Sequence, residues 1–574
     1  MKNIKESANF IWSIADLLRG DYKQSDYGKV ILPLTVLRRL DCVLENSKAE
    51  VLKKYEQSKS LNIQNLDPIL NKSAGYNFHN HSQFDFNKLV ADPNNIASNL
   101  RNYINGFSED AREIIEQFEF ENQITKLDDN NLLFMIIKRF QEVDLHPEVI
   151  SSMEMGYMFE ELIRKFAEIS NETAGEHFTP REVIKLMVNI LFLNDREILT
   201  KKGVVKTIYD CCAGTGGMLS VADEYLHELN PHARLEMFGQ ELNPESYAIC
   251  KSDMMIKGQN SSNIKKGNSI SEDKLPNEKF DYLITNPPFG VKWEKFAKPV
   301  LDEHKTKGHG GRFGAGLPSK SDGSFLFLMH LISKMKQDEH GSRLAIVFNG
   351  SPLFSGSPST TKNESSIRQW VIENDMLESI VALPNQLFYN TGISTYIWVL
   401  NNRKSKLRKG KVQLINAVDF YKKMSKSLGN KRNEIAKKQI AEITKAYGDF
   451  EETPISKIFD NTDFGYSKVT VERPLRNEIG AIITDKNGNP KADSSLRDTE
   501  NIPLKEDIKK YMKREVLPHV PDAWVDESKT NVGYELNFTK YFYEYKPLRS
   551  LEQIRADIFA LEAETDSLIK NVVV

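Results

Sequence analysis

Residues 204–217 read VVKTIYDCCAGTGG, and this stretch decides the fold. Its first half is a run of apolar and β-branched residues, which predicts a buried strand at 204–209. Glycines at positions 214, 216 and 217 follow, and a helical stretch begins at 218. Glycine permits a sharp turn and lets a ligand approach the backbone closely, and the helix N-terminus presents unpaired N–H groups there. The stretch therefore predicts a strand, a ligand-binding turn and a helix.

Further apolar runs alternate with helical stretches beyond this unit. They occur at 235–238, 280–284, 344–348, 377–382 and 396–400. Such alternation predicts an α/β domain at 151–405, with a Rossmann-like, mostly parallel sheet and helices on both faces. Residues 1–150 have helical spacing without strand patterns, so we expect a helical N-terminal domain.

Residues 406–574 form a third, highly charged region that ends in a predicted helix. Ser550 and Gln553 have the spacing of a capping box at its start. Apolar residues then recur in steps of three and four, at Leu551, Ile554, Ile558, Leu561 and Leu568, with Thr565 in the same series. This is the seam of a coiled coil, although a helix packed on its own domain accounts for it as well. We expect a coiled-coil-like helix that serves subunit assembly.

The composition is that of an ordinary globular chain, with 40% hydrophobic and 27% charged residues. No apolar run reaches the roughly 18 residues of a membrane span, so no membrane partner is expected. The four cysteines, Cys42, Cys211, Cys212 and Cys250, contain no C-x-x-C pair. This argues against a metal site and for a reducing cytoplasm.

The net charge of −3 gives no overall sign of nucleic-acid binding. Two stretches are locally basic, the glycine-rich 305–312 and the run 403–411. Solvated loops account for both somewhat better than DNA contacts do.

Three ligands compete for the glycine turn. A nucleoside triphosphate is disfavoured because the lysine and hydroxyl of G-x-x-x-x-G-K-[ST] are missing. A dinucleotide is disfavoured because the glycines depart from G-x-G-x-x-G and because Asp210, at the strand tip, would repel a pyrophosphate. The same carboxylate suits a ligand with ammonium and sulfonium charges. We therefore expect S-adenosylmethionine, bound by Asp210, Gly214, Thr215, Gly216 and Gly217.

Three further stretches predict other parts of the cofactor site. Glu241 follows the second apolar run, where a carboxylate can accept hydrogen bonds from both ribose hydroxyls. Asn268 lies where the third strand should end, near the cofactor adenine. Upstream, Pro180 suits the first turn of a helix that is capped by Thr179. We expect this cap to frame the methionine end of the cofactor, through Glu176, His177, Phe178, Thr179, Pro180 and Arg181.

Residues 285–290, TNPPFG, end the apolar run at 280–284. Two consecutive prolines stop strand pairing, because neither has an N–H to donate. Taken alone, the motif is explained equally well by a strand exit and by a functional role.

Five stretches, taken in chain order, resemble the motifs of the N6-adenine DNA methyltransferases. They are GEHFTPREV, DCCAGTGG, QELN, GNS and TNPPFG. With the helical N-terminal region, they resemble more narrowly the modification (M) subunit of Type I restriction–modification systems. The resemblance implies a bacterial or archaeal cytoplasmic enzyme, nucleoid-associated when bound, that methylates adenine N6 at specific sites in double-stranded DNA.

The resemblance also implies partner subunits. A separate specificity (S) subunit chooses the target sequence, usually with two M subunits to one S, and a restriction (R) motor-nuclease subunit can join. The helices of the S subunit are the expected partners of the terminal heptads. Two positions depart from the family pattern: Asn268 stands where Asp is common, and Cys211 where Pro is common.

The resemblance assigns the chemistry to the TNPPFG motif. The adenine N6 lone pair is delocalised into the ring, so this amine is a poor nucleophile. The Asn286 side-chain oxygen and the Pro287 carbonyl are expected to accept the two N6–H bonds, which stabilises the positive charge that develops during transfer. Pro288 restricts Pro287 to extended backbone, and Phe289 offers a face for the flipped base.

Other acceptors pose the same chemical problem. Three other acceptors stay open: an RNA adenine, a protein glutamine amide and cytosine N4. A non-catalytic role also stays open, in which the chain only assembles a DNA-bound complex. The large helical N-terminus and the terminal heptads favour the DNA methyltransferase.

Overall fold

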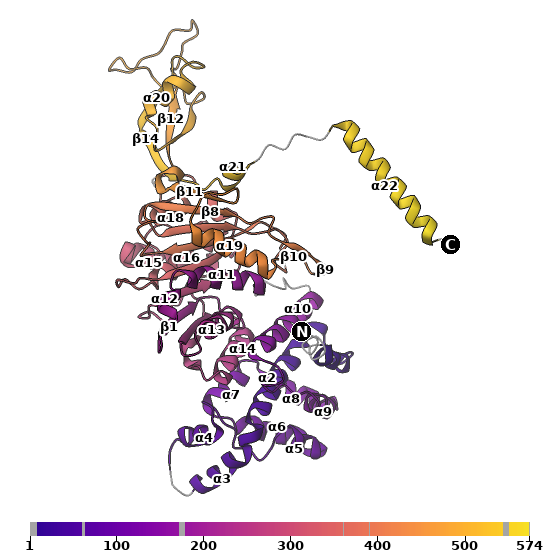
Figure 1. Cartoon of the computed structure of the whole chain (residues 1–574). Coiled ribbons are helices and arrows are strands. Elements are labelled where there is room, and N and C mark those ends of the chain that lie inside the picture. The colour runs from indigo at the N-terminus through magenta and orange to yellow at the C-terminus, as the bar shows by residue number, and fades with distance from the viewer. Residues whose placement is uncertain are drawn as a thin grey trace. The chain divides into compact units, whose positions relative to one another are not determined.

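The structure is a computed structural model that describes residues 9–59, 63–170, 178–359, 361–389, 391–543 and 550–572 (Figure 1). The chain divides into two compact units, Met1–Leu536 and Asn537–Val574. The first unit holds a helical region, a large sheet with its helices, and a smaller sheet. None of the described helices is long and apolar enough to cross a membrane.

The N-terminal region is helical, as the sequence predicts. Its helices are α2 (Gly28–Leu44), α3 (Lys48–Lys59), α4 (Asp67–Ala74), α5 (Phe86–Ala91), α6 (Ile96–Asn105), α7 (Glu109–Glu116), α8 (Phe120–Asp129), α9 (Leu133–Gln141) and α10 (Ser152–Ser170). Helix α2 is buried on nearly every side, so the others pack around it. Its Arg38 donates to the Val143 carbonyl at 2.8 Å, which ties the centre of the bundle to its end.

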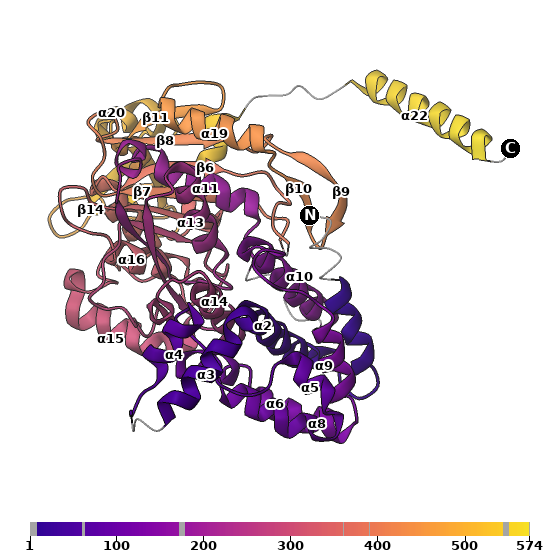
Figure 2. The ribbon, with the colours of Figure 1, turned by 60° about the horizontal axis from the view of Figure 1, so that its bottom comes forward.

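This helical region shares its hydrophobic core with the sheet domain. Ala248, Ile249 and Met255 of helix α14 (Pro244–Ile256) belong to the same buried cluster as the N-terminal helices. Lys251 of α14 also pairs with Glu113 of α7 at 2.6 Å. Figure 2 shows α14 beside α2. The helical region is therefore packed directly against the domain that carries the glycine turn.

The central sheet has nine strands in the order β11-β8-β6-β7-β5-β4-β1-β2-β3. The strands are β1 (Val205–Asp210), β2 (Arg234–Glu241), β3 (Ile264–Lys266), β4 (Tyr282–Thr285), β5 (Arg343–Asn349), β6 (Leu377–Ala382), β7 (Thr395–Asn401), β8 (Lys411–Asn416) and β11 (Ser456–Asp460). Strand β7 runs antiparallel between β5 and β6, and β11 antiparallel to β8; the other neighbours are parallel. This confirms the predicted mostly parallel sheet and all six predicted strands.

Helices cover both faces of this sheet, as the alternation predicts. They are α11 (Arg181–Leu193), α13 (Gly217–Leu229), α15 (Ala297–Lys307), α16 (Ser324–Ser333), α18 (Glu364–Glu373) and α19 (Lys437–Asp449), with the short α12 (Arg196–Leu199) and α17 (Ser351–Phe354). Neighbouring residues of β1 point to opposite faces. Ile208 joins the core beneath α11 and α13, whereas the Tyr209 hydroxyl lies 3.0 Å from His330 Nε2 of α16.

The sheet continues past residue 405, where the sequence predicts a domain boundary. Strands β8 and β11 lie beyond that position and pair within the same sheet. The basic run 403–411 resembles an exposed linker in composition, but two of its cations are buried. Lys404 pairs with Asp375 at 2.7 Å, and Arg408 lies 3.6 Å from the buried carboxylate of Glu378. The run is therefore an anchored corner between strands of one sheet.

Two smaller sheets complete the first unit. A hairpin joins β9 (Lys422–Leu428) and β10 (Lys431–Glu434), and a three-stranded antiparallel sheet joins β13 (Asp498–Pro503), β12 (Gly465–Glu472) and β14 (Trp524–Tyr534). Val469, Val471 and Ile502 form the core of the three-stranded sheet, against helix α20 (Ile508–Tyr511) and its continuation.

The second unit contains helices α21 (Phe538–Phe542) and α22 (Leu551–Val572). The predicted capping box is present: Gln553 N donates to Ser550 Oγ at 3.2 Å, and Ser550 N to Gln553 Oε1 at 3.1 Å. Leu551 and Leu561 are 85% and 62% exposed, and the side chain of Leu568 lies outside the described residues. A coiled-coil partner for this helix stays a prediction.

Candidate functional site

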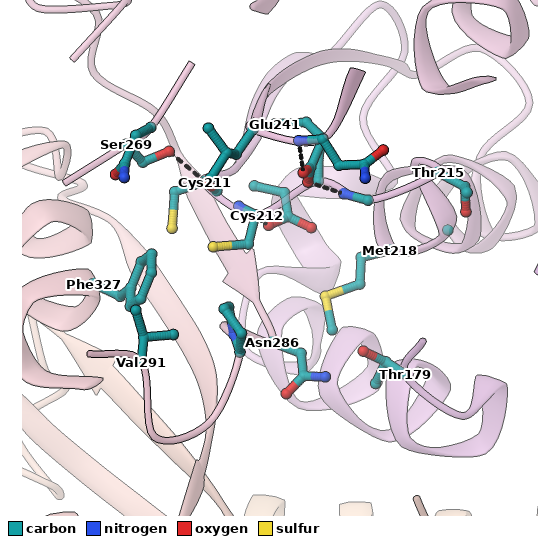
Figure 3. A pocket seen from close by; sticks show the side chains of 18 of the residues that line it. Thr179, Cys211, Cys212, Thr215, Met218, Glu241, Ser269, Asn286, Val291 and Phe327 are labelled. Atoms are coloured by element: carbon teal, nitrogen blue, oxygen red, sulfur yellow. Dashed lines mark hydrogen bonds between the residues drawn. The ribbon is translucent and has the colours of Figure 1, made fainter. Parts of the chain in front are cut away.

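A cavity of about 480 Å³ lies where β1, β2, β3 and β4 end. The carboxyl ends of parallel strands are where open α/β sheets bind ligands. Figure 3 shows Glu241 and Ser269 toward one end of this cavity and Asn286 and Thr179 toward the other. Both halves of the predicted site therefore open into one space.

The glycine turn after β1 forms the floor of the cavity. Gly214 and Gly216 have φ values of 54° and 84°, the left-handed region that favours glycine. A Cβ on Gly216 would also come within 2.9 Å of Cys250 Sγ, so this position has no room for a side chain. The turn delivers Gly217 as the first residue of α13, which places a helix N-terminus at the cavity, as predicted.

Asp210 is buried at the tip of β1, and its carboxyl group has a raised pKa. Its Oδ1 accepts hydrogen bonds from Cys212 N at 2.9 Å and Thr285 Oγ1 at 2.7 Å. Burial raises its pKa to about 7, although these two bonds favour the carboxylate, and nearby Glu241 adds to the rise. A buried carboxylate at a cavity wall is costly without a counter-charge, so Asp210 is suited to a cationic ligand.

Glu241 ends β2 and clamps the glycine turn. Its Oε2 accepts from Gly214 N at 2.8 Å and its Oε1 from Asn243 N at 2.7 Å. A carboxylate has about four lone-pair positions, so both oxygens can still accept bonds from a ligand. The hydrogen bonds hold the side chain in one orientation beside the cavity.

The turn after β3 forms the next wall. Asn268 Oδ1 accepts from Ile270 N at 2.9 Å, and Ser269 Oγ donates to the Cys211 carbonyl at 2.5 Å. Arg312 braces the same turn from behind, because its guanidinium donates to the carbonyls of Ser269 at 2.8 Å and Ile270 at 2.9 Å. The amide oxygen of Asn268 is thus used inside the turn, and its NH₂ group is the part suited to a ligand.

The segment before α11 closes the opposite end. Thr179 lines the cavity, but it does not cap the helix. Pro180 is the N-cap, with ψ at 135°, and its carbonyl accepts from Val183 N at 2.9 Å and Ile184 N at 3.1 Å. The predicted cap was therefore one residue too early, because the extended backbone of Pro180 starts the helix only at Arg181.

Arg181 lies behind the cavity wall. It pairs with the buried carboxylate of Glu160 at 2.6 Å and donates to the Gly217 carbonyl at 3.0 Å. Burial raises the pKa of Glu160, and the positive charge of Arg181 opposes that rise. Glu160 itself lines the cavity. The arginine thus links α10 to the first turn of α13 and orients an acidic side chain toward the ligand space.

Asn286, directly after β4, has a buried acceptor with no partner. Its Oδ1 receives no hydrogen bond from the described part of the chain, and the residue lines the cavity. A buried polar atom without a partner is unfavourable by about 1–3 kcal/mol, and a bound molecule or a catalytic role is one explanation for such an atom in a native fold. Asn286 is therefore positioned to accept a hydrogen bond from a molecule in the cavity.

Most of the predicted site residues meet at this cavity. Its walls include Thr179, Asp210, Gly214, Thr215, Gly217, Glu241, Asn268, Asn286 and Pro288. Phe178, Pro180, Arg181, Gly216, Pro287 and Phe289 support these walls without being among the lining residues. Phe289 is half-buried, with its ring 6.1 Å from that of Phe388. Glu176 and His177 lie outside the described residues.

Several lining residues were not predicted from the sequence. They are Glu160, Ile184, Cys211, Cys212, Ala213, Met218, Leu242, Pro244, Gly267, Ser269, Ile270, Val291, Phe296 and Phe327, and Asn243. Leu242 could have been found from its position, because it directly follows Glu241 at the predicted strand tip; its side chain is 61% exposed. Glu160 and Phe327 had none, because only the tertiary fold brings α10 and α16 to the turn. Among the described residues no cluster of His, Cys, Asp or Glu could hold a metal ion.

The arrangement defines the class of the protein. A glycine turn, acidic tips on the first two strands and a buried acidic wall form a Rossmann-like domain for a positively charged, ribose-containing ligand. Comparison with known proteins narrows this class. The protein-family model described as N-6 DNA Methylase matches residues 151–474, more than half of the chain. The family model of the HsdM N-terminal domain matches residues 7–140.

Individual relatives agree with these matches. The MjaIX Type I restriction enzyme methylase subunit of Methanocaldococcus jannaschii is 26% identical over 83% of both chains. The HindI methylase subunit of Haemophilus influenzae is 29% identical over 46% of this chain and 54% of its own. A solved type I methyltransferase subunit from Streptococcus thermophilus, at 24% identity, covers 80% of this chain and 97% of its own with a TM-score of 0.61, and shows the same fold.

The chain therefore belongs to the N-6 DNA methylase family, in the branch formed by the methylase subunits of Type I restriction enzymes. This confirms the resemblance carried by the motifs. The cofactor of the family is S-adenosylmethionine, and the cavity fits it. Asp210 and Glu160 offer negative charge to a cationic ligand, Glu241 offers acceptors to a ribose, and the glycine turn leaves the backbone accessible.

Proposed function

We propose that this methyltransferase methylates N6 of a flipped adenine in duplex DNA, at sites chosen by a separate specificity subunit. The proposal rests on the buried Oδ1 of Asn286, which has no hydrogen-bond partner among the described residues and lies in the same cavity as Asp210 and Glu241. S-adenosylmethionine supplies an activated methyl group on a sulfonium. The residues of this chain bind the cofactor, orient the target amine and stabilise the positive charge that develops on that amine.

Cofactor binding is assigned to the acidic walls. Asp210 and Glu160 attract the positive charges, and Glu241 accepts the ribose hydroxyls while its bonds to Gly214 and Asn243 hold it still. Asn268 faces the adenine with its amide NH₂, since its oxygen is bonded to Ile270 N. This accounts for an Asn where the family often has Asp: the contact becomes a donor to a ring nitrogen.

Activation of the target amine is assigned to the TNPPFG motif. Asn286 Oδ1 accepts one N6–H bond and the Pro287 carbonyl the other, which draws the nitrogen toward tetrahedral geometry. Both acceptors then face positive charge as it develops on nitrogen, and this interaction is strong in a site from which water is excluded. The proton leaves the product ammonium to solvent, so no strong general base is required.

Base selection and partners are part of the same proposal. Phe289 packs against Phe388 at the edge of the core and would stack on the flipped base from that position. Duplex DNA, one S subunit per two M subunits and an R subunit are the proposed partners. The exposed apolar residues of α22, such as Leu551, Ile558 and Leu561, are the proposed contact to the S subunit.

A transfer assay with competing acceptors tests the proposal. The chain, with the subunits that copurify with it, receives methyl-labelled S-adenosylmethionine and a mixture of duplex DNA, RNA and protein. The proposal predicts label in DNA alone, and Asn286→Ala should slow its incorporation by about 100- to 1000-fold while cofactor binding is retained. Label in RNA or protein, or full transfer by Asn286→Ala, would contradict it.

A further inference from the structure

The β9–β10 hairpin concentrates positive charge in a chain whose net charge is −3. Residues 422–434 contain four lysines, one arginine and one acid, Glu434, which gives the hairpin a net charge of +4. The two stretches that look basic in the sequence keep exposed cations as well, such as Lys307 and Lys406, but each also commits cations to internal contacts. The structure uses Arg312 of the first, and Lys404 and Arg408 of the second, in buried internal contacts.

The cations of the hairpin face solvent. None of the β9 side chains is buried, and Lys423, Lys426 and Arg432 are exposed. Within the described part of the chain, these three have no acidic side chain at ion-pair distance, whereas Lys422 pairs with Glu434 at 2.8 Å. Three uncompensated cations therefore lie on one short β-ribbon.

The fifth cation fastens the hairpin to the cofactor domain. Lys431 is buried, pairs with Glu182 in the first turn of α11, and donates to the Leu387 carbonyl at 2.9 Å. The next residues add two bonds to backbone carbonyls: Arg432 N donates to the Gln386 carbonyl at 2.9 Å, and the side-chain Nδ2 of Asn433 donates to the Asn385 carbonyl at 2.9 Å. These bonds hold strand β10, from its turn end onward, against the loop 383–389.

The same loop contacts the TNPPFG motif. Phe388 meets Phe289 edge to face, with ring centroids 6.1 Å apart. The loop thus has the proposed target-base motif on one side and the hairpin on the other. Glu182, to which Lys431 is tied, lies three residues after Thr179 of the cavity wall. The hairpin is consequently fixed beside the part of the site where a target base would enter.

We propose that the β9–β10 hairpin binds the phosphate backbone of duplex DNA next to the flipped base. This rests on the proposed function, since it names the surface that holds the substrate. Lysines dominate the exposed set and act as point charges on phosphates, so the contact should be independent of base sequence. A two-stranded ribbon is also narrow enough to follow a groove of the duplex.

A salt titration of DNA binding tests the hairpin. The variant Lys423→Gln/Lys426→Gln/Arg432→Gln keeps Lys431 and the Lys422–Glu434 pair, so the hairpin retains its anchors. The control Lys53→Gln/Lys54→Gln/Lys72→Gln removes the same charge from exposed positions of α3 and α4. The full chain, with the subunits that copurify, binds a fluorescent duplex at increasing salt, and cofactor binding is measured in parallel.

Each lost phosphate contact should flatten the plot of log affinity against log salt by about 0.9. We expect the hairpin variant to lose about 2–3 from the slope, with cofactor affinity unchanged, and the control to retain the wild-type slope. Equal slopes in all three proteins, or the same loss in the control, would overturn the proposal. So would a loss of affinity confined to single-stranded RNA, because the contact would then not be to duplex DNA.

Failure of this proposal is distinguishable from failure of the proposed function. If the wild-type protein methylates DNA and the hairpin variant retains the wild-type salt slope, only the proposal about the hairpin is refuted. Wild-type protein that transfers methyl groups to RNA or protein refutes the function.

Discussion

Asp210→Asn should make the cofactor-free protein more stable and the cofactor site inactive. The substitution preserves the shape of the side chain, and the amide oxygen can still accept from Cys212 N and Thr285 Oγ1. It removes only the negative charge. Because Asp210 is buried, that charge is unfavourable for the fold and useful only when a cation is bound.

The pKa of Asp210 sets the magnitude. Burial raises it from 3.8 to about 7, which corresponds to about 4 kcal/mol at roughly 1.4 kcal/mol per pH unit. Between pH 4 and 7 the folded state retains a proton that the unfolded chain has released, so stability falls as the pH rises through this window. The loss is complete above pH 7. At pH 8, Asp210→Asn should therefore raise the free energy of unfolding by up to about 4 kcal/mol, and near pH 3 by little.

Urea unfolding at pH 3–8 and cofactor titration measure the two effects. In the wild type, about one Asp210 in ten is ionised at pH 6 and about nine in ten at pH 8, given a pKa of about 7. Affinity for S-adenosylmethionine should thus fall about tenfold from pH 8 to pH 6, and Asp210→Asn should bind weakly at both.

Asp281→Asn is the matched control, because its effect on the free energy of unfolding should have the opposite sign. Burial alone would raise the pKa of Asp281, but hydrogen bonds from Lys336, Lys206 and Thr207 outweigh it and lower the pKa. This carboxylate stabilises the fold at neutral pH, so its replacement should destabilise. If Asp210→Asn is no more stable than wild type at pH 8, or binds the cofactor as tightly, the account of Asp210 is refuted.

Three other substitutions separate the parts of the site. Asn286→Ala should lower kcat by about 100- to 1000-fold with cofactor affinity unchanged; a change in affinity instead would contradict its placement at the target amine. Arg312→Gln removes the brace on the Ser269 and Ile270 carbonyls and should raise the KM for S-adenosylmethionine about tenfold, with partial recovery in Arg312→Lys and little effect on kcat. Gly216→Ala should lower the free energy of unfolding by about 1–2 kcal/mol because of its positive φ, and further because of the clash with Cys250. Its control, Gly258→Ala, has a φ of 69° and no atom within 4 Å, so urea unfolding should show the φ strain alone.

The glycine turn and the strands were predictable because their signals are local. The run 204–209 needs only its neighbours to be recognised as a strand, and the turn needs glycine wherever φ is positive, as at Gly214 and Gly216. The order of Asp210, Glu241 and Asn286 along the chain then implied a common edge, since parallel strands end on the same side.

The rest of the site depends on contacts between distant segments. Glu160 enters the cavity wall because Arg181 holds it, and the sequence separates the two by about twenty residues with no pattern that links them. Arg312 lies in a glycine-rich basic stretch, yet its guanidinium pairs with Glu303 and donates to the Ser269 carbonyl in the turn after β3. Composition describes the charge of a segment and leaves open where the folded chain directs it.

The identity of the methylated nucleoside decides whether this chain is an adenine-N6 methyltransferase. Duplex DNA is incubated with the chain, its copurifying subunits and S-adenosylmethionine, then digested to nucleosides and measured by mass spectrometry. We expect N6-methyladenine at a defined sequence, formed about 100- to 1000-fold more slowly by Asn286→Ala. N4-methylcytosine, or no methylated base from a complex that binds both DNA and cofactor, would contradict it.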